Sequence, residues 1–166
     1  MRVLGIDPGS VTTGYGIVDE HRGNLALVAQ GSIRAGKAGK ELPDRLVLIF
    51  EGLREVIAAH SPVAAAIETP FAGRNVRSLV QLAQARGVAV LAARIAGLEI
   101  FEYAPSAVKN AIVGYGRAEK HQVAKMVKML LPGMRDTVLG PDAADALAVA
   151  ICHVHVSKFT SRIRKQ

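Results

Sequence analysis

Four acidic residues occupy positions from which their carboxylates could act together on a substrate. Asp7 and Glu68 each end an apolar run, and Asp142 and Asp145 lie three residues apart after Gly140-Pro141, where a helix can begin. Clustered carboxylates repel one another and lose hydration, and a bound cation relieves both costs. Their hard oxygen atoms suit Mg²⁺, with Mn²⁺ as a possible substitute. Two such ions, about 4 Å apart, could activate a water molecule and stabilise the leaving 3′ oxygen of a phosphodiester.

Each acid taken alone also has a simpler interpretation. Asp7 could only form a turn, and Asp142 could be the N-cap of the last helix. Glu68 is harder to explain in this way, because it follows the apolar sequence VAAAI and a buried acid needs a partner. His153 and His155 are two residues apart and would point to different sides of a helix, so we do not expect them to bind a metal together.

The first third of the chain predicts three strands. They cover Val3–Ile6, Thr13–Val18 and Leu25–Ser32, and the polar segment Asp19–Asn24 (DEHRGN) is expected to connect the second strand to the third. Short connections of this kind favour an antiparallel meander.

Helices and strands alternate in the middle of the chain. Apolar residues at helical spacing predict a helix over Leu42–His60, which Ser61-Pro62 would end. The continuous apolar run Val63–Ile67 is typical of a buried parallel strand. A long helix is predicted over Asn75–Ala96, followed by a strand at Glu99–Tyr103.

Three further helices are predicted in the last third. Ala104-Pro105-Ser106 is expected to cap the first of them, Ala107–Val113, and the second covers Lys120–Leu131. The last helix is expected to run from Asp142 to about His155. The basic end of the chain that follows is expected to be frayed.

This order of elements defines an α/β fold, with a five-stranded mixed sheet flanked by helices, as in the ribonuclease H-like fold. Residues 1–157 are expected to form one domain and residues 158–166 a basic, flexible tail. If the strands before Asp7 and Glu68 are parallel neighbours, both carboxylates lie at the carboxyl edge of the sheet, where such sheets bind ligands.

The charge of the chain favours a polyanionic partner. Its 166 residues include 21 Lys and Arg against 14 Asp and Glu, a formal net charge of +7. The segment 70–94 contains four Arg and no acid, and the segment 105–135 contains six Lys or Arg and one Glu. These basic segments follow the strands that end at Glu68 and Tyr103, so they can flank the acidic cluster.

Composition also limits where the protein works. One cysteine, Cys152, excludes an internal disulfide and lies in an apolar stretch that predicts a core position. No apolar run is long enough to span a membrane, and Asp7 interrupts any apolar signal-peptide core. We therefore expect a cytoplasmic protein without a membrane partner.

Four segments together resemble the RuvC family of crossover junction endodeoxyribonucleases: GIDPGSVTTGYGIV, AIETPFAGRN, APSAVKNAIVGYGRAEKHQV and GPDAADALAVAICHVH. The similarity extends over almost the whole chain. GIDPGS alone is also similar to the phosphate loops of actin-like kinases, whereas DAADALAVAICH with an upstream GRAEKHQV is specific to the RuvC family.

The resemblance implies a function and a set of site residues. The family resolves four-way (Holliday) DNA junctions with metal ions, and its metal-binding carboxylates match Asp7, Glu68, Asp142 and Asp145. Phe71 matches an aromatic residue that enters the junction and stacks on a base. The remaining expected DNA contacts are polar or basic residues that follow these strands: Arg74, Asn75, Arg77, Lys109 and Lys120.

The resemblance also implies partners. The family acts as a symmetric homodimer, which suits the near two-fold symmetry of a four-way junction, and cooperates with the branch-migration proteins RuvA and RuvB. Two alternatives stay open at this point. An actin-like phosphotransferase would need a second domain, for which 166 residues leave no room. A catalytically inactive DNA-binding scaffold would not need four intact acids.

Overall fold

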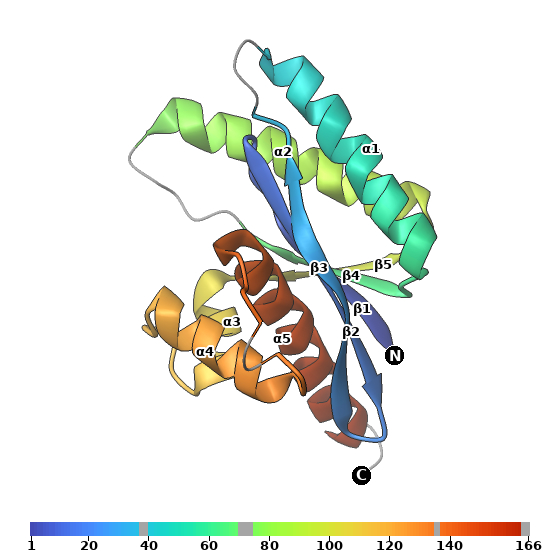
Figure 1. The fold of residues 1–166 in the computed structure, drawn as a ribbon, viewed down its shortest axis with the longest axis vertical. Coiled ribbons are helices and arrows are strands. Elements are labelled where there is room, and N and C mark those ends of the chain that lie inside the picture. The colour runs from blue at the N-terminus through green and yellow to red at the C-terminus, as the bar shows by residue number, and fades with distance from the viewer. Residues whose placement is uncertain (37–39, 70–74, 135–136, 164–166) are drawn as a thin grey trace.

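Five strands form one mixed sheet with helices on both of its faces, in a computed structural model of the chain (Figure 1). The structure describes residues 1–36, 40–69, 75–134 and 137–163, with side chains as far as residue 157. The strands are β1 (Arg2–Asp7), β2 (Thr12–His21), β3 (Asn24–Arg34), β4 (Ala64–Glu68) and β5 (Glu99–Tyr103). The helices are α1 (Leu42–His60), α2 (Val76–Ile95), α3 (Pro105–Val113), α4 (Lys120–Leu130) and α5 (Pro141–Ile163).

The strand order is β3-β2-β1-β4-β5. The first three strands are antiparallel, and β4 and β5 run parallel to β1. The meander and the mixed sheet predicted from the sequence are therefore confirmed. The connection between β2 and β3 is shorter than predicted, because the strands extend to His21 and from Asn24. Arg22 and Gly23 alone make the turn, both with positive φ (50° and 94°), as a tight hairpin requires.

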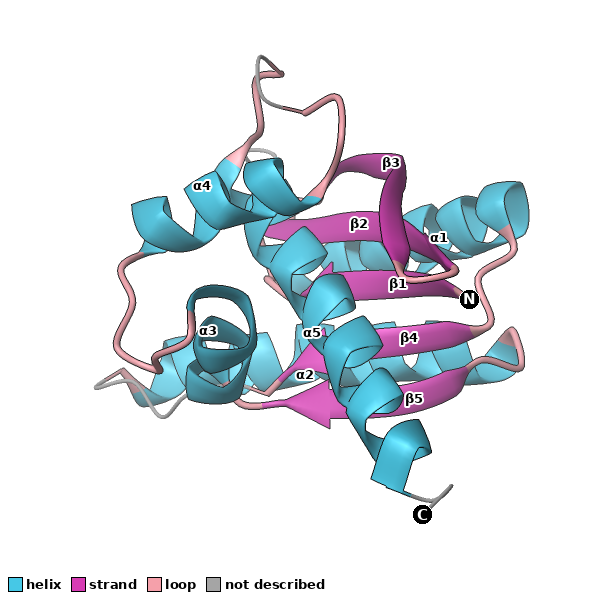
Figure 2. Ribbon diagram, turned by 90° about the horizontal axis from the view of Figure 1, so that it is seen from below, coloured by secondary structure: helices cyan, strands magenta, loops and turns pink. Residues whose placement is uncertain are grey.

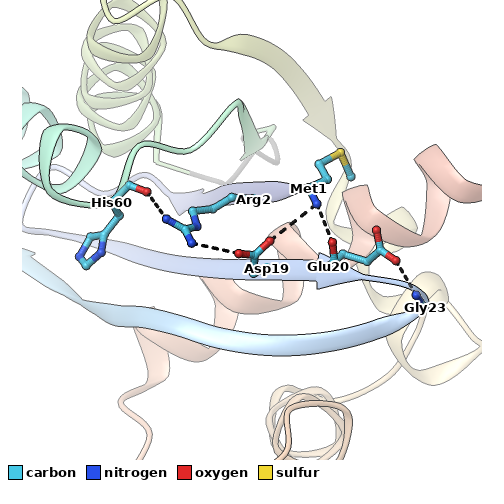
Figure 3. Close-up of polar contacts among 6 residues, drawn as sticks. All are labelled: Met1, Arg2, Asp19, Glu20, Gly23 and His60. Atoms are coloured by element: carbon cyan, nitrogen blue, oxygen red, sulfur yellow. Dashed lines mark hydrogen bonds and ion pairs between the residues drawn. The ribbon is translucent and has the colours of Figure 1, made fainter.

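A polar network ties the start of β1 to its neighbours at the end of the sheet away from Asp7 (Figure 3). The Arg2 guanidinium donates to the Asp19 carboxylate at 3.0 Å and to the carbonyl oxygen of His60 at 2.7 Å. The terminal amino group of Met1 donates to the carbonyl oxygen of Glu20. The hydrogen bond from Arg2 holds the pKa of Asp19 below its ordinary value. These contacts join β1, β2 and the end of α1.

Apolar side chains fill the space on both sides of the sheet. Helices α1 and α2 cover one face and α3, α4 and α5 cover the other, as Figures 1 and 2 both show. Strand alternation sends Leu4 and Ile6 toward α1 and α2, and sends Val3 toward α5. Four buried alanines let α2 pack closely against the rest of its layer: Ala85, Ala89, Ala92 and Ala93.

The helix predictions are confirmed in number and order; most bounds agree within one residue, and the larger differences are at the start of α3 and the end of α5. Helix α1 has the predicted bounds, and Ser61 ends it in the left-handed region (φ 48°). The expected cap of α3 is wrong, because the helix begins at Pro105 and its N-cap residue, Ala104, has no side chain that can cap. Helix α5 continues to Ile163 rather than ending near His155, since no Gly or Pro interrupts it.

Within the described ranges, no helix is both long and apolar enough to cross a membrane.

Candidate active site

Asp7 and Glu68 lie side by side at one edge of the sheet. Asp7 is the last residue of β1 and Glu68 is the last residue of β4, and the two strands are parallel neighbours with Ile6 opposite Ile67. After Glu68, the backbone N–H of Thr69 donates to the carbonyl oxygen of Tyr103 at 2.9 Å, which fixes the exit from the strand. The predicted meeting of the two acids at the carboxyl edge is therefore confirmed.

Glycines bring α5 against the sheet and thereby place the other two acids. A Cβ atom on Gly14 would lie 2.1 Å from the carbonyl oxygen of Asp142, and one on Gly5 would lie 1.9 Å from that of Ala146. Both distances are shorter than atoms can approach, so only glycine permits this packing. Gly14 pairs with Asp7 in the sheet. The first turn of α5 is consequently held beside Asp7.

A cavity of about 330 Å³ opens at this edge of the sheet. Three of the four predicted acids line it, namely Asp7, Glu68 and Asp145, together with both predicted lysines, Lys109 of α3 and Lys120 of α4. The other lining residues come from all the helices except α1 and from the segments that follow β1 and β4: Pro8, Thr69, Leu82, Arg86, Pro105, Val108, Val123 and Ala148.

Asp142 lies next to this cavity and is not among its lining residues. Its charge still acts on Asp7, although more weakly than the charges of Asp145 and Glu68 do. The helix begins at Pro141, so Asp142 belongs to the first turn of α5 and is not its N-cap. The structure therefore brings three of the four acids to one cavity and gives Asp142 a more peripheral position.

Two acids of the cavity, Asp7 and Glu68, resist deprotonation. Burial, followed by the negative charges of Asp145 and Glu68, raises the pKa of Asp7 from an ordinary 3.8 to about 7. Burial and the charge of Asp145 also raise the pKa of Glu68. Such a concentration of unfavourable negative charge marks a site that is built to accept positive charge.

Lys120 supplies part of that positive charge. Its ammonium nitrogen lies 2.6 Å from a carboxylate oxygen of Asp145, and this hydrogen bond raises the pKa of the lysine. The Lys120 side chain is 79% exposed, so its position is not fixed by packing. A cation is thus present at the cavity, on a side chain that can move away from the acids.

The acids fit a hard divalent cation in their chemistry. As the side chains lie, no three Asp, Glu, His or Cys residues of the described chain are close enough together to coordinate one ion. The cavity nevertheless presents three carboxylates, the ligands that Mg²⁺ and Mn²⁺ prefer, and burial disfavours the ionisation of Asp7 and Glu68 unless a positive charge joins them. To coordinate one ion together, these side chains would have to change rotamer.

The remaining predicted DNA contacts are only partly covered by the structure. Phe71 and Arg74 lie outside the described residues. Asn75 is the N-cap of α2, where its side-chain oxygen accepts a hydrogen bond from the backbone N–H of Ser78 at 3.2 Å. Arg77 is exposed on the first turn of α2 and does not line the cavity.

Two groups near the site were not singled out by the sequence as functional. Arg86 of α2 lines the cavity, although the sequence indicated only that it belongs to the helix predicted over Asn75–Ala96. His153, on α5, is buried, and a ring nitrogen lies 2.7 Å from the hydroxyl oxygen of Tyr103. His155 contacts the carbonyl oxygen of Ala111 instead. The two histidines therefore have different partners.

The fold and the site together define a class. A five-stranded mixed sheet in this order, with paired carboxylates at the ends of β1 and β4 and more on the last helix, is the ribonuclease H-like arrangement of metal-dependent nucleases.

Comparison with known proteins identifies the family. The family model of the crossover junction endodeoxyribonuclease RuvC matches residues 3–153. A protein of that name from Trichlorobacter lovleyi is 54% identical, over 93% of this chain and 85% of its own length. One from Chloroflexus aggregans is 45% identical over 98% of both chains. The chain belongs to the RuvC family of crossover junction endodeoxyribonucleases, which use divalent metal ions.

Solved structures agree with this assignment. Thermus thermophilus RuvC, in complex with a Holliday junction substrate, superposes with a TM-score of 0.88, at 30% identity and with 96% of each chain covered. The yeast mitochondrial Holliday junction resolvase has a TM-score of 0.68 at 10% identity, which shows a common fold.

Proposed function

We propose that this protein resolves four-way DNA junctions by metal-dependent phosphodiester hydrolysis, nicking two strands of like polarity symmetrically during recombination and repair. The observation that carries the proposal is the cavity itself, in which three carboxylates face two lysines. The acids can hold metal and the lysines can hold phosphate. A relative of the same fold, from Thermus thermophilus, forms a complex with a Holliday junction substrate.

The four acids are the proposed metal ligands. Asp7, Glu68 and Asp145 face the cavity, and Asp142 lies beside Asp7. When bound, two Mg²⁺ ions, or Mn²⁺ in their place, would activate a water molecule and stabilise the leaving oxygen. To coordinate metal, Asp145 would have to give up its hydrogen bond with Lys120, and the lysine would then be free to contact the DNA.

Lys109 and Lys120 are the proposed phosphate contacts nearest the reacting bond. They line the cavity from α3 and α4, and both of their charges act on Glu68. An ammonium group in the same cavity as the acids can neutralise a non-bridging phosphate oxygen that the acids would otherwise repel. The lysines would therefore bring the DNA backbone to an acidic centre.

The other proposed contacts follow β4. Phe71 would stack on an unpaired base, and Arg74 and Arg77 would bind backbone phosphates. Because the side-chain oxygen of Asn75 is occupied at the start of α2, this residue would contact DNA through its amide nitrogen.

A second copy of the chain is the proposed partner of α2. Four apolar side chains of this helix are more than half exposed: Val76, Val80, Leu91 and Ile95. They recur at helical spacing along one face, which is costly to leave in water and typical of a self-complementary helix contact. A two-fold axis through this face would relate two cavities, as symmetric cutting requires.

The dimer can be tested separately from catalysis. Leu91→Glu should convert the dimer to a monomer in sedimentation velocity, and Val47→Glu, a matched change on the exposed face of α1, should not. If both variants and the unchanged protein have the same mass in solution, α2 is not the dimer interface. Cooperation with RuvA and RuvB stays a prediction from the family.

The decisive experiment compares substrates and metal. A synthetic four-way junction and a linear duplex of the same arms are incubated with the protein, each with Mg²⁺ or with a chelator. We expect paired nicks in the junction alone, and only with Mg²⁺. Asp7→Asn should be inactive, whereas Glu51→Gln, which removes an exposed carboxylate of α1, should cut normally. Equal cutting of the duplex, or cutting in the chelator, would contradict the proposal.

A further inference from the structure

Arg86 extends from α2 to the wall of the cavity on the side away from α3 and α4. It lines the cavity together with Leu82 of the same helix, whereas the lysines come from the other layer. Its side chain is 23% exposed. The sheet edge that carries Asp7 and Glu68 therefore lies between basic residues of both helical layers.

One carboxylate holds Arg86 in this position. A terminal nitrogen of the guanidinium donates to the Glu102 side chain, on β5. Glu102 pairs with Ile67 in the sheet, one residue before Glu68, so the contact fixes the arginine relative to the catalytic edge. The guanidinium is thereby tied to the same strands that carry the acids.

The guanidinium keeps donors that the protein does not use. Arginine has five N–H donors, and one hydrogen bond to Glu102 is the contact that the described residues supply. Its Nε atom is buried without a hydrogen-bond partner among them. The terminal N–H groups that remain after the bond to Glu102 lie on a partly exposed guanidinium at the wall of a cavity, where they are suited to the oxygens of a phosphate.

We propose that Arg86 binds a backbone phosphate of the DNA strand that enters the cavity, and that Glu102 is a positioning residue that orients its guanidinium. This inference rests on the proposed nuclease function. The bound strand would then contact the lysines of α3 and α4 on one side and the arginine, which Glu102 holds in place, on the other. The arginine would fix where the strand lies relative to Asp7 and Glu68.

The test compares three variants with a distant control. Arg86→Gln removes the charge, Arg86→Lys keeps the charge without the fork, and Glu102→Gln keeps the arginine but weakens its orientation. Arg22→Gln removes one exposed charge in the β2–β3 turn, at the opposite end of the sheet. Junction affinity is measured in chelator over a salt series. Cleavage is measured in Mg²⁺ with the protein at saturating concentration, and melting temperature on the same samples.

We expect Arg86→Gln to flatten the dependence of log affinity on log salt by about one unit. Its cleavage rate at saturation should fall about tenfold or more, since a charged hydrogen bond to the substrate is lost. Arg86→Lys should regain the salt dependence and only part of the rate. Glu102→Gln should keep the salt dependence and lose part of the rate, and Arg22→Gln should change neither.

An unchanged salt dependence in Arg86→Gln, or an unchanged rate at saturation, overturns the inference. The inference is also overturned if Arg86→Gln and Glu102→Gln lower the melting temperature equally and do not differ in salt dependence or cleavage rate. A purely structural ion pair predicts that result. Failure of the nuclease proposal would look different: the unchanged protein would not cut the junction in Mg²⁺. The salt series would still decide whether Arg86 binds phosphate, because it needs no cleavage.

Discussion

The ammonium nitrogen of Lys120 and a carboxylate oxygen of Asp145 lie 2.6 Å apart in the cavity that holds the other acids. This contact places a protein cation on a side chain that we propose as a metal ligand. The lysine also lowers the pKa of Asp7 and of Glu68, against the effects of burial and of the other acids. Lys120 and a metal ion would therefore compete for Asp145.

Removing the lysine should consequently strengthen metal binding. In Lys120→Met, the Mg²⁺ concentration that gives half of the maximal thermal stabilisation should fall, by no more than about fivefold because the lysine is exposed to water. Cleavage should fall at the same time, since the phosphate contact is lost. Lys128→Met, on the same helix, is the control. An unchanged Mg²⁺ requirement in Lys120→Met would show that the ion pair does not oppose the metal.

The acids should be needed for cutting and not for binding. Changing Asp7, Glu68, Asp142 or Asp145 singly to the amide should lower the single-turnover cleavage rate by about a hundredfold or more, because metal coordination supplies several kcal/mol to the transition state. Junction affinity in chelator should persist, since phosphate contacts come from basic residues. Gel-based cleavage and fluorescence anisotropy on the same samples check this. Near-normal cutting by two of the variants would contradict the assignment.

Junction affinity should depend steeply on salt. Lys109→Gln and Lys120→Gln should each flatten the dependence of log affinity on log salt by about one unit, if each lysine releases counterions from a phosphate. Both lysines line the cavity, which supports a contact with the backbone. Anisotropy titrations at several salt concentrations measure the slope. If neither variant changes it, the two lysines are solvated surface residues in the complex.

Asp7 should reduce the stability of the metal-free protein at neutral and alkaline pH. Its folded pKa of about 7 exceeds the ordinary 3.8, so the folded state holds a proton that the unfolded state releases between these values. Stability is thus lost as the pH rises through this window. Asp7→Asn should melt at the same temperature as the unchanged protein near pH 4 and at a higher temperature at pH 8, where its free energy of unfolding should be larger by at most about 4 kcal/mol. An equal melting temperature at pH 8 would contradict the raised pKa.

The positions of Asp7 and Glu68 could be predicted because each one ends an apolar run, and a parallel pair of strands places such residues at one edge. The position of Arg86 could not. Helical spacing indicates which side of α2 is packed, but the pairing with Glu102 depends on how α2 crosses β5. That crossing is set by tertiary packing of the buried alanines, which periodicity alone does not describe.

Helix ends were predicted well where proline or a left-handed residue interrupts the backbone, as at Ser61. The end of α5 differs from the prediction, because a basic, polar composition is typical of a frayed end although nothing in the segment breaks a helix. How closely α5 approaches the sheet could not be predicted either. It depends on glycines whose spacing in GIDPGSVTTGYG indicated only turns and strands.

That close approach provides the last prediction. A methyl group on Gly14 would lie 2.1 Å from the carbonyl oxygen of Asp142, so Gly14→Ala must push the first turn of α5 away from β2 or strain the strand. We expect a melting temperature lower by roughly 3–10 °C and a loss of cleavage, because the acids of α5 move relative to Asp7. Gly87→Ala is the control, since its added methyl group would meet open space and would favour helix α2. Scanning calorimetry and junction cleavage on both variants measure the two effects. Normal cleavage by Gly14→Ala would mean that the placement of Asp142 and Asp145 does not depend on the glycine contact.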